Sequence, residues 1–381
     1  MIQTNIGTNN LKNCEMKYCF FLIILISNQL YGQSKFDSQL ENSVINRKYL
    51  KTQFDYLRNP RKDDYNIIVV HTLKELSNLK NKEQIKAINF QLQYPGYDKE
   101  TDIPEILNFK NLEYLDIFGN VNIPEGIDKL QKLKYLSTTL FSTKIQPKIG
   151  NLKNLESLRF EFCDYQEKIP EEIYNLTNLK VLVMNRLHFL DSISPSIGNL
   201  VNLEKLSFDD CVVKLPIEIL KLTKLKYLVC PKAQSAIYKL KTLKVLHTVA
   251  LDSTDLIGLG NLSNLEELYL VVDNTTNELK KLKNLKYLFI TSHHDTKIID
   301  LSSLLNLEVL IMIRCKIRVL PSFIYNLKKI KYITANVCEE LNFISPKINS
   351  IKSLEYLELK GNKNLKEYPK IKNKIIINFG E

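Results

Sequence analysis

The side chains that most often perform chemistry are few and scattered in this sequence. Its five histidines include one cluster, His293-His294-Asp295, and a metal site there would need further ligands from other parts of the chain. Gly258-Leu259-Gly260 lacks the third glycine of a dinucleotide-binding loop, and the sequence contains neither a phosphate-binding loop nor a zinc-protease motif. We therefore expect no catalytic residue, no cofactor and no metal ion.

The elements that would position any functional residue are repeats. The pattern Leu-x-x-Leu-x-Leu, with occasional Ile, Phe, Met, Thr or Cys, begins every 22 residues or so at thirteen positions: Ile85, Leu112, Leu133, Leu155, Leu179, Leu203, Leu225, Leu243, Leu265, Leu285, Leu307, Ile330 and Leu354. Such a spacing predicts one strand and one returning segment per repeat. The last two leucines would point inward and the residues between them outward. A proline in many returning segments is expected to interrupt regular structure there.

The fullest repeats carry a resemblance to a known family. They read IPEEIYNLTNLKVLVM from Ile169 and LPSFIYNLKKIKYI from Leu320. These resemble the Ile/Leu-Pro-x-x-Ile-x-x-Leu repeats of the plant disease-resistance and Shoc-2-like class of leucine-rich-repeat proteins. The resemblance covers roughly residues 73–368 and implies an α/β solenoid, a horseshoe with a parallel concave sheet of about 13 repeats. For function it implies recognition of proteins or peptides and little more.

The ends of the chain read differently from the repeats. Residues 1–32 resemble a secretory signal peptide with an N-terminal extension, because Met16-Lys17 precedes the apolar run Tyr18 to Ile26 and Gly32 permits cleavage before Gln33. Translation could start at Met1 or Met16. The run is shorter than the roughly 20 residues that span a bilayer, so we expect no stable membrane anchor. We expect an N-terminal cap at 33–72, repeats at 73–368, a C-terminal cap at 369–381, and a secreted, periplasmic or cell-surface protein.

Positions that recur in every repeat form columns of neighbours in a parallel stack. The residue after the first leucine alternates between Lys and Glu, which avoids like charges about 5 Å apart. The one fault is Lys226 beside Lys244, at the shortest repeat, which has 18 residues. The next column holds six tyrosines, which form either a recognition surface or ordinary cross-strand packing: Tyr114, Tyr135, Tyr227, Tyr287, Tyr332 and Tyr356.

Four of the seven cysteines also share a column. Eight residues after the first leucine stand residues that are expected to satisfy backbone groups in the turn after the strand: Asn120, Cys163, Cys211, Cys315, Cys338 and Asn362. His293 falls in the same column, so a turn role explains it better than metal binding. Cys230 occupies a core leucine position. We expect buried free thiols, although Cys315 and Cys338 lie in adjacent repeats and could form a disulfide.

The repeats from Gln234 to Asp300 lack the proline, and the outward strand positions in and around them are unusually apolar. We call these residues the apolar strip: Val229, His247, Val249, Tyr269, Val271, Phe289, Ile311 and Ile313. An exposed contiguous apolar patch marks an interaction site. The alternative is that such residues simply suit strands. The strip favours a protein or peptide partner. The other hypothesis is an adhesin or envelope-polysaccharide-binding protein, which should expose aromatic rings alternating with Asp, Asn and Glu.

A net charge of +11 could indicate binding to nucleic acid. The lysines, however, are interleaved with glutamates along the charged column. Mixed charges of this kind describe a solvated surface, so we do not expect a nucleic-acid partner.

The signal-like segment predicts export with cleavage before Gln33. N-terminal sequencing of the protein from fractionated producing cells should give a mature chain that begins near Gln33. An intact chain starting at Met1 or Met16 in the cytosol would contradict the expectation.

Overall fold

The computed structural model describes residues 64–92, 101–119, 121–139, 145–161, 168–187, 190–209, 211, 213–370 and 376–378, without the side chains of 139, 161, 292–296 and 376–378. The expected signal peptide, most of the N-terminal cap, Asn120 and Cys163 lie outside the described residues. So do the side chains of the His293-His294-Asp295 cluster.

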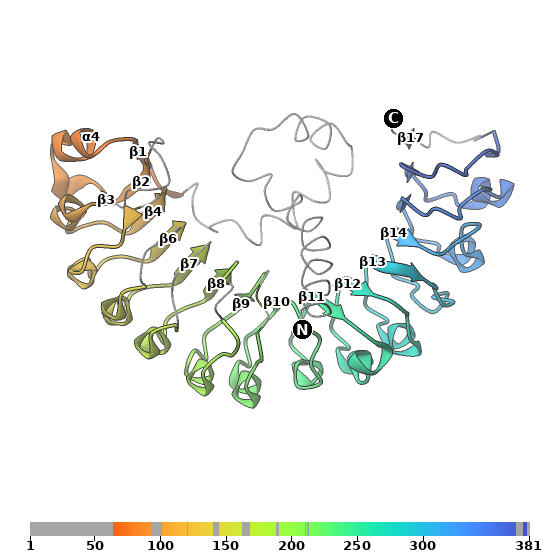
Figure 1. The fold of residues 1–381 in the computed structure, drawn as a ribbon, viewed down its shortest axis with the longest axis horizontal. Coiled ribbons are helices and arrows are strands. Elements are labelled where there is room, and N and C mark those ends of the chain that lie inside the picture. Colours follow the sequence, from red (N-terminus) through yellow and green to blue (C-terminus); the bar gives the residue numbers. More distant parts are fainter. Residues whose placement is uncertain are drawn as a thin grey trace, which may run out of the picture.

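The repeats stack into a curved, parallel sheet (Figure 1), which in the described chain has 15 strands. Thirteen of them belong to the thirteen expected repeats, and one further strand pairs at each end. In sheet order the strands are β1 (Ile68–Val70), β2 (Ala87–Gln91), β4 (Tyr114–Phe118), β6 (Tyr135–Thr139), β7 (Ser157–Glu161), β8 (Val181–Asn185), β9 (Lys205–Ser207), β10 (Tyr227–Cys230), β11 (Val245–Ala250), β12 (Glu267–Val272), β13 (Tyr287–Thr296), β14 (Val309–Cys315), β15 (Tyr332–Asn336), β16 (Tyr356–Glu358) and β17 (Ile376–Asn378).

The convex side consists mainly of short 3₁₀ helices. These are η4 (Lys82–Gln84), η5 (Pro104–Asn108), η6 (Ile127–Lys129), η7 (Pro147–Asn151), η8 (Glu171–Asn175), η9 (Pro195–Asn199), η10 (Ile217–Lys221), η11 (Ile237–Lys239), η12 (Ser253–Leu256), η13 (Leu259–Asn261), η14 (Asn277–Lys281), η15 (Ser322–Asn326) and η16 (Pro346–Ser350). One α-helix, α4 (Leu73–Asn78), precedes them, and a small second sheet pairs β3 (Thr101–Asp102) with β5 (Val121–Asn122). Within the described ranges, no helix is both long enough and apolar enough to cross a membrane.

The expectation that the repeat proline interrupts regular structure is wrong. Pro104, Pro147, Pro195 and Pro346 are each the first residue of a 3₁₀ helix. In η8, η10 and η15 the proline directly precedes the helix. Proline has a fixed φ and no N–H, and both properties suit a first turn, where the N–H would have no partner inside the helix. The proline therefore starts the returning segment.

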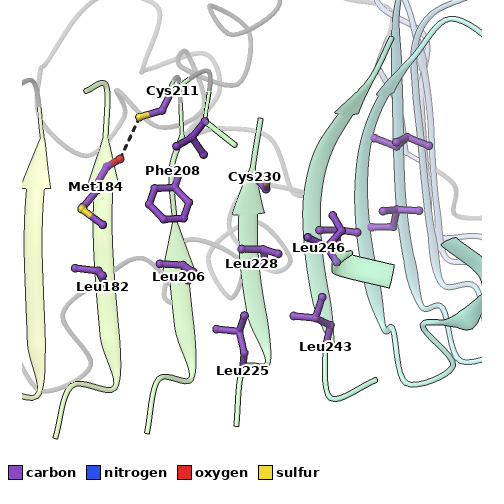
Figure 2. Packing of buried hydrophobic residues seen from close by; sticks show 14 of the residues in the cluster. Leu182, Met184, Leu206, Phe208, Cys211, Leu225, Leu228, Cys230, Leu243 and Leu246 are labelled. Atoms are coloured by element: carbon purple, nitrogen blue, oxygen red, sulfur yellow. Dashed lines mark hydrogen bonds between the residues drawn. The ribbon is translucent and has the colours of Figure 1, made fainter. Parts of the chain in front are cut away.

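Inward-pointing leucines form the core between the sheet and the 3₁₀ helices. Leu228 lies in register with Leu206 on one side and Leu246 on the other, and all three are completely buried. Figure 2 shows this packing across successive strands, with Phe208 and Cys230 in the same layer. Each repeat contributes only a few such side chains, so the core becomes continuous only because neighbouring repeats stack.

The alternating charged column forms a ladder of ion pairs along the edge where the strands begin. Glu113 contacts the ammonium groups of both neighbours, Lys86 at 3.4 Å and Lys134 at 2.7 Å. The other contacts in the ladder have N–O distances of 2.6–2.9 Å and join Lys180 to Glu156, Lys226 to Glu204, Lys244 and Lys286 to Glu266, and Lys331 to Glu308. Because these groups are partly exposed, each pair contributes little by itself, and the alternation mainly avoids repulsion.

The cysteine and asparagine column satisfies backbone groups as expected. The thiol of Cys211 donates to the carbonyl of Met184 at 3.2 Å and its sulfur accepts from the amide of Leu187 at 3.3 Å (Figure 2). The side-chain amide of Asn362 donates to the carbonyl of Ala335 at 2.7 Å. The four described cysteines, Cys211, Cys230, Cys315 and Cys338, are all buried free thiols.

Five free thiols are expected in the chain from Gln33 onward, because the four buried thiols and Cys163 make up all its cysteines. Titration of denatured, unreduced protein with a thiol reagent measures this number. A count of three or fewer, unchanged by alkylation of the protein before lysis, would show that a disulfide exists and would contradict the turn role assigned to the cysteine column.

Candidate binding surface

The structure places all eight residues of the apolar strip on five neighbouring strands, β10 to β14. Parallel pairing puts five of them in one row across these strands: Val229, His247, Tyr269, Phe289 and Ile311. The next outward row contains Val249, Val271, Thr291 and Ile313 in register. Thr291 is the one polar residue that interrupts the second row. The sequence expectation that the strip is contiguous in space is therefore confirmed.

Rings from four successive strands contact one another at the centre of this surface. The centroid of His247 lies 5.5 Å from that of Tyr227 and 3.9 Å from that of Tyr269. Tyr269 in turn stacks on Phe289 at 5.6 Å. We call these four residues the ring row. His247, Tyr269 and Phe289 lie in register, and the strand spacing of about 4.8 Å brings them within contact distance. Tyr227 belongs to the tyrosine column, in register with Val245, and contacts His247 diagonally.

The strip is less exposed than the sequence suggested, and this part of the expectation is wrong. Five of its residues are 9% exposed or less: Val229, Val249, Val271, Phe289 and Ile311. His247, Tyr269 and Ile313 are partly exposed. Phe289 and Ile311 pack in a cluster with Val309, Tyr332 and Tyr356. Side chains stacked at strand spacing cover the flanks of their neighbours, so an outward position in a long parallel sheet still loses most of its contact with water.

Packing explains the buried members of the tyrosine column, whereas Tyr287 is partly exposed. Tyr114 and Tyr135 lie 6.2 Å apart between ring centroids, and Tyr332 and Tyr356 show the same separation. All of these rings are 2% exposed. Of the two interpretations left open by the sequence, cross-strand packing is the one that fits such buried rings.

Sequence reasoning missed Glu267, a buried carboxyl beside the ring row. It occupies the tyrosine column, in register with Val245 and Tyr287, and is 8% exposed. Its Oε2 atom is buried and has no hydrogen-bond partner in the part of the chain that the structure describes. The signal in the sequence was the pair Glu266-Glu267, because only the first acid fits the alternating column.

Burial controls the ionisation of two side chains on this surface. Burial, with a smaller effect from the charge of Glu266, raises the pKa of Glu267 to about 7, while Lys286 opposes the shift. Burial lowers the pKa of His247 to about 3, so the imidazole is neutral at physiological pH. The surface therefore offers aromatic and aliphatic contacts next to one buried carboxyl group.

The described residues contain no group of three or more His, Cys, Asp or Glu side chains that could hold a metal ion.

Comparison with known proteins supports the same fold. No family model matches the sequence, and no curated protein matches it. A leucine-rich-repeat protein of Leptospira interrogans has a similar structure, with a TM-score of 0.59 and 25% identity over 78% of this chain and 84% of that one. An internalin from Listeria monocytogenes gives a TM-score of 0.56 and 19% identity, over 75% of this chain and 88% of that one.

The functional domain of InlJ from Listeria monocytogenes, which includes a cysteine ladder, is also similar. Its TM-score is 0.50 at 15% identity, over 73% of this chain and 62% of that one. The parallel sheet, the repeat spacing and these similarities define the chain as a leucine-rich-repeat solenoid.

Replacing Glu267 by Gln should stabilise the protein at high pH and not at low pH. Well below pH 4.5 the Glu267 carboxyl is protonated in both the folded and the unfolded chain, so its ionisation does not change the free energy of unfolding there. As the pH rises to about 7 the unfolded chain ionises first, and the folded state loses stability relative to it. Above pH 7 the loss is constant, about 3 kcal/mol for this shift.

Urea unfolding of both proteins, followed by circular dichroism at pH 4 and pH 8, measures the difference. Glu267→Gln should raise the midpoint at pH 8 and leave it nearly unchanged at pH 4. The same difference at both pH values would mean that Glu267 is not a buried, ionising group.

Proposed function

We propose that this protein is a non-catalytic scaffold that binds a protein or peptide on the concave face of β10 to β14, outside the cytoplasm. The observation that carries the proposal is the ring row, in which four rings from neighbouring strands contact one another. Tyr227 and Phe289 are buried and hold the partly exposed rings of His247 and Tyr269 in place, so a partner can contact these two rings without ordering flexible side chains on binding.

The surroundings of the ring row fit a peptide. Tyr269 and Ile313 are partly exposed, so they can contact apolar side chains of a ligand. Glu267 has a buried oxygen without a partner, which a backbone amide, a lysine or an arginine of a ligand reaches only if the side chains that cover it move aside. A buried polar atom without a partner costs free energy, and a ligand that supplies the donor recovers that cost. The surface therefore combines apolar anchors with one directional contact, as binding sites do.

The location outside the cytoplasm rests on the sequence. The apolar run Tyr18 to Ile26 and the small residue Gly32 support a cleaved export signal. An exported binding scaffold would meet its partner in the envelope, on the cell surface or in the medium.

Recognition of an envelope polysaccharide, as by an adhesin, is the second candidate. The observation in its favour is that the row containing the rings becomes polar in the first repeats, where it holds Asn89, Asp116, Ser137 and Arg159 in register. Such side chains suit sugar hydroxyls. The apolar half of the row lies on later strands and favours a peptide.

Replacing Ile313 by Lys should weaken peptide binding strongly while leaving the fold intact. Peptides selected from a random phage-displayed library on the immobilised protein supply the ligands. A buried unpaired ammonium at the interface should cost about 2 kcal/mol, roughly thirtyfold in affinity. Because Ile313 is partly exposed in the free protein, the melting temperature should fall by no more than about 2 °C.

Glu161→Lys is the matched control, because residue 161 lies in the same outward row as Ile313 but on β7, in register with Asn185. It should bind the selected peptides as the unchanged protein does. Phe289→Glu is unsuitable as a test, since Phe289 is buried in a cluster and its replacement should destabilise the fold. Equal binding by the Ile313 variant, or displacement of the peptides by purified envelope polysaccharide, would contradict the peptide proposal.

A further inference from the structure

A second surface feature lies away from the strip, at the edge where the strands begin. A hollow of about 600 Å³ extends there past the starts of the strands from β9 to β14. It is lined only by residues at or next to the charged column and its preceding turn: Glu204, Thr223, Lys224, Lys226, Thr242, Lys244, Asn264, Glu266, Asn284, Lys286 and Asn306.

The two repeats at the centre of the hollow lack an asparagine that many other repeats carry, because Lys224 and Thr242 stand at this position. In seven described repeats the asparagine before the first leucine donates to a carbonyl of the preceding repeat at 2.6–2.9 Å: Asn111, Asn154, Asn178, Asn202, Asn264, Asn284 and Asn306. In the 18-residue repeat this position is Thr242. Its shorter side chain donates to the nearer carbonyl of Leu225 at 2.7 Å, as Ser353 does to the carbonyl of Ile330 in a later repeat.

The charges of the same repeats are also interrupted there. Lys226 and Lys244 lie on adjacent strands, joined by the hydrogen bond from the amide of Lys244 to the carbonyl of Lys226 at 2.8 Å. Their ammonium groups turn away from each other. Lys226 reaches Glu204 at 2.9 Å on one side, and Lys244 reaches Glu266 at 2.9 Å on the other. Elsewhere in the column a glutamate of an intervening repeat separates successive lysines, whereas these two lysines are direct neighbours with no carboxylate between them.

At two places in the column, one glutamate contacts the lysines of both neighbouring repeats. Glu113 contacts the ammonium groups of Lys86 and Lys134, at 3.4 and 2.7 Å. Glu266 contacts those of Lys244 and Lys286, at 2.9 and 2.7 Å. In both cases one carboxylate neutralises lysines from two repeats. The fold therefore already uses a single carboxylate as the partner of a lysine pair along this edge.

We propose that the hollow between Lys226 and Lys244 binds one carboxylate of a peptide, an aspartate or glutamate side chain that supplies the charge missing from the column. The two ammonium groups would rotate inward to donate to it. This site is separate from the strip and does not depend on the function proposed for the concave face.

The lining favours an isolated carboxylate over a polyanion. It holds four lysines and two glutamates, so its net charge is 4 − 2 = +2. Glu204 and Glu266 stand on either side of the lysine pair and would repel a second negative group. The side-chain amides of Asn264 and Asn284 already donate to the preceding repeat, and their oxygens can accept hydrogen bonds from the peptide backbone beside the acidic residue. Phosphate chains and polyuronates carry a charge on every unit and fit this arrangement less well.

Binding can be measured by calorimetry at low salt with two neutral-backbone peptides, acetyl-Gly-Ser-Gly-Glu-Gly-Ser-Gly-amide and the same peptide with Gln in place of Glu. The Glu peptide should bind with one-to-one stoichiometry and at least tenfold more tightly than the Gln peptide. The double variant Lys226→Gln/Lys244→Gln should lose this preference. The double variant Lys180→Gln/Lys331→Gln removes the same charge from the same column outside the hollow, and should keep it.

Circular dichroism and the melting temperature check that both double variants are folded. The Ile313→Lys variant should still bind the Glu peptide more tightly than the Gln peptide. This result would therefore stand even if the concave face does not bind peptides. The proposal is overturned if the protein does not distinguish the two peptides at millimolar concentration, or if both double variants lose the preference equally. Tighter binding of inorganic triphosphate or polygalacturonate than of the Glu peptide would overturn it too.

Discussion

The structure depends on one constraint, which is that successive repeats stack in parallel and in register. Every residue then has a neighbour of the same repeat position about 4.8 Å away on each side. A charge, a ring or a hydrogen-bonding side chain therefore has to be compatible with its own column. Lysine and glutamate alternate, tyrosines pack against tyrosines, and asparagines bond to the preceding repeat. At the inward positions, leucines of neighbouring repeats pack against one another in the same way. This core stabilises the chain only when several repeats are stacked.

The repeat positions were predictable because the constraint appears directly in the sequence. The thirteen first leucines place every repeat strand, and the period-two alternation gives the inward face correctly, as Leu228, Leu246 and Leu268 show. The charged column and the turn role of Cys211 followed from the same alignment. The role of proline could not be predicted from the alignment. Its effect depends on whether it stands at the start of a helical turn or inside one, and the repeat spacing does not specify which.

The exposure of the concave side chains could not be read from the pattern. Alternation tells which face a residue points to, whereas the exposed fraction depends on how large its neighbours in the row are. Phe289 is 6% exposed because Tyr269 and Ile311 flank it in register. Glu267 illustrates the same limit, since its ionisation depends on burial beside Val245 and Tyr287. Sequence therefore located the candidate surface, and the structure determined which of its side chains a ligand can touch.

Two departures from regularity coincide in the middle of the chain. The ring row begins at β10, and the charge fault separates β10 from β11. We infer that both departures serve binding, because the repeat pattern does not require these residue types at these positions. The most direct measurement is a crystal structure of the protein with a library-selected peptide. The peptide should lie across β10 to β14, in contact with Tyr269 and Ile313, with a donor on the carboxyl of Glu267. A peptide bound instead on the convex 3₁₀ helices or on β2 to β7 would contradict the assignment of the concave surface.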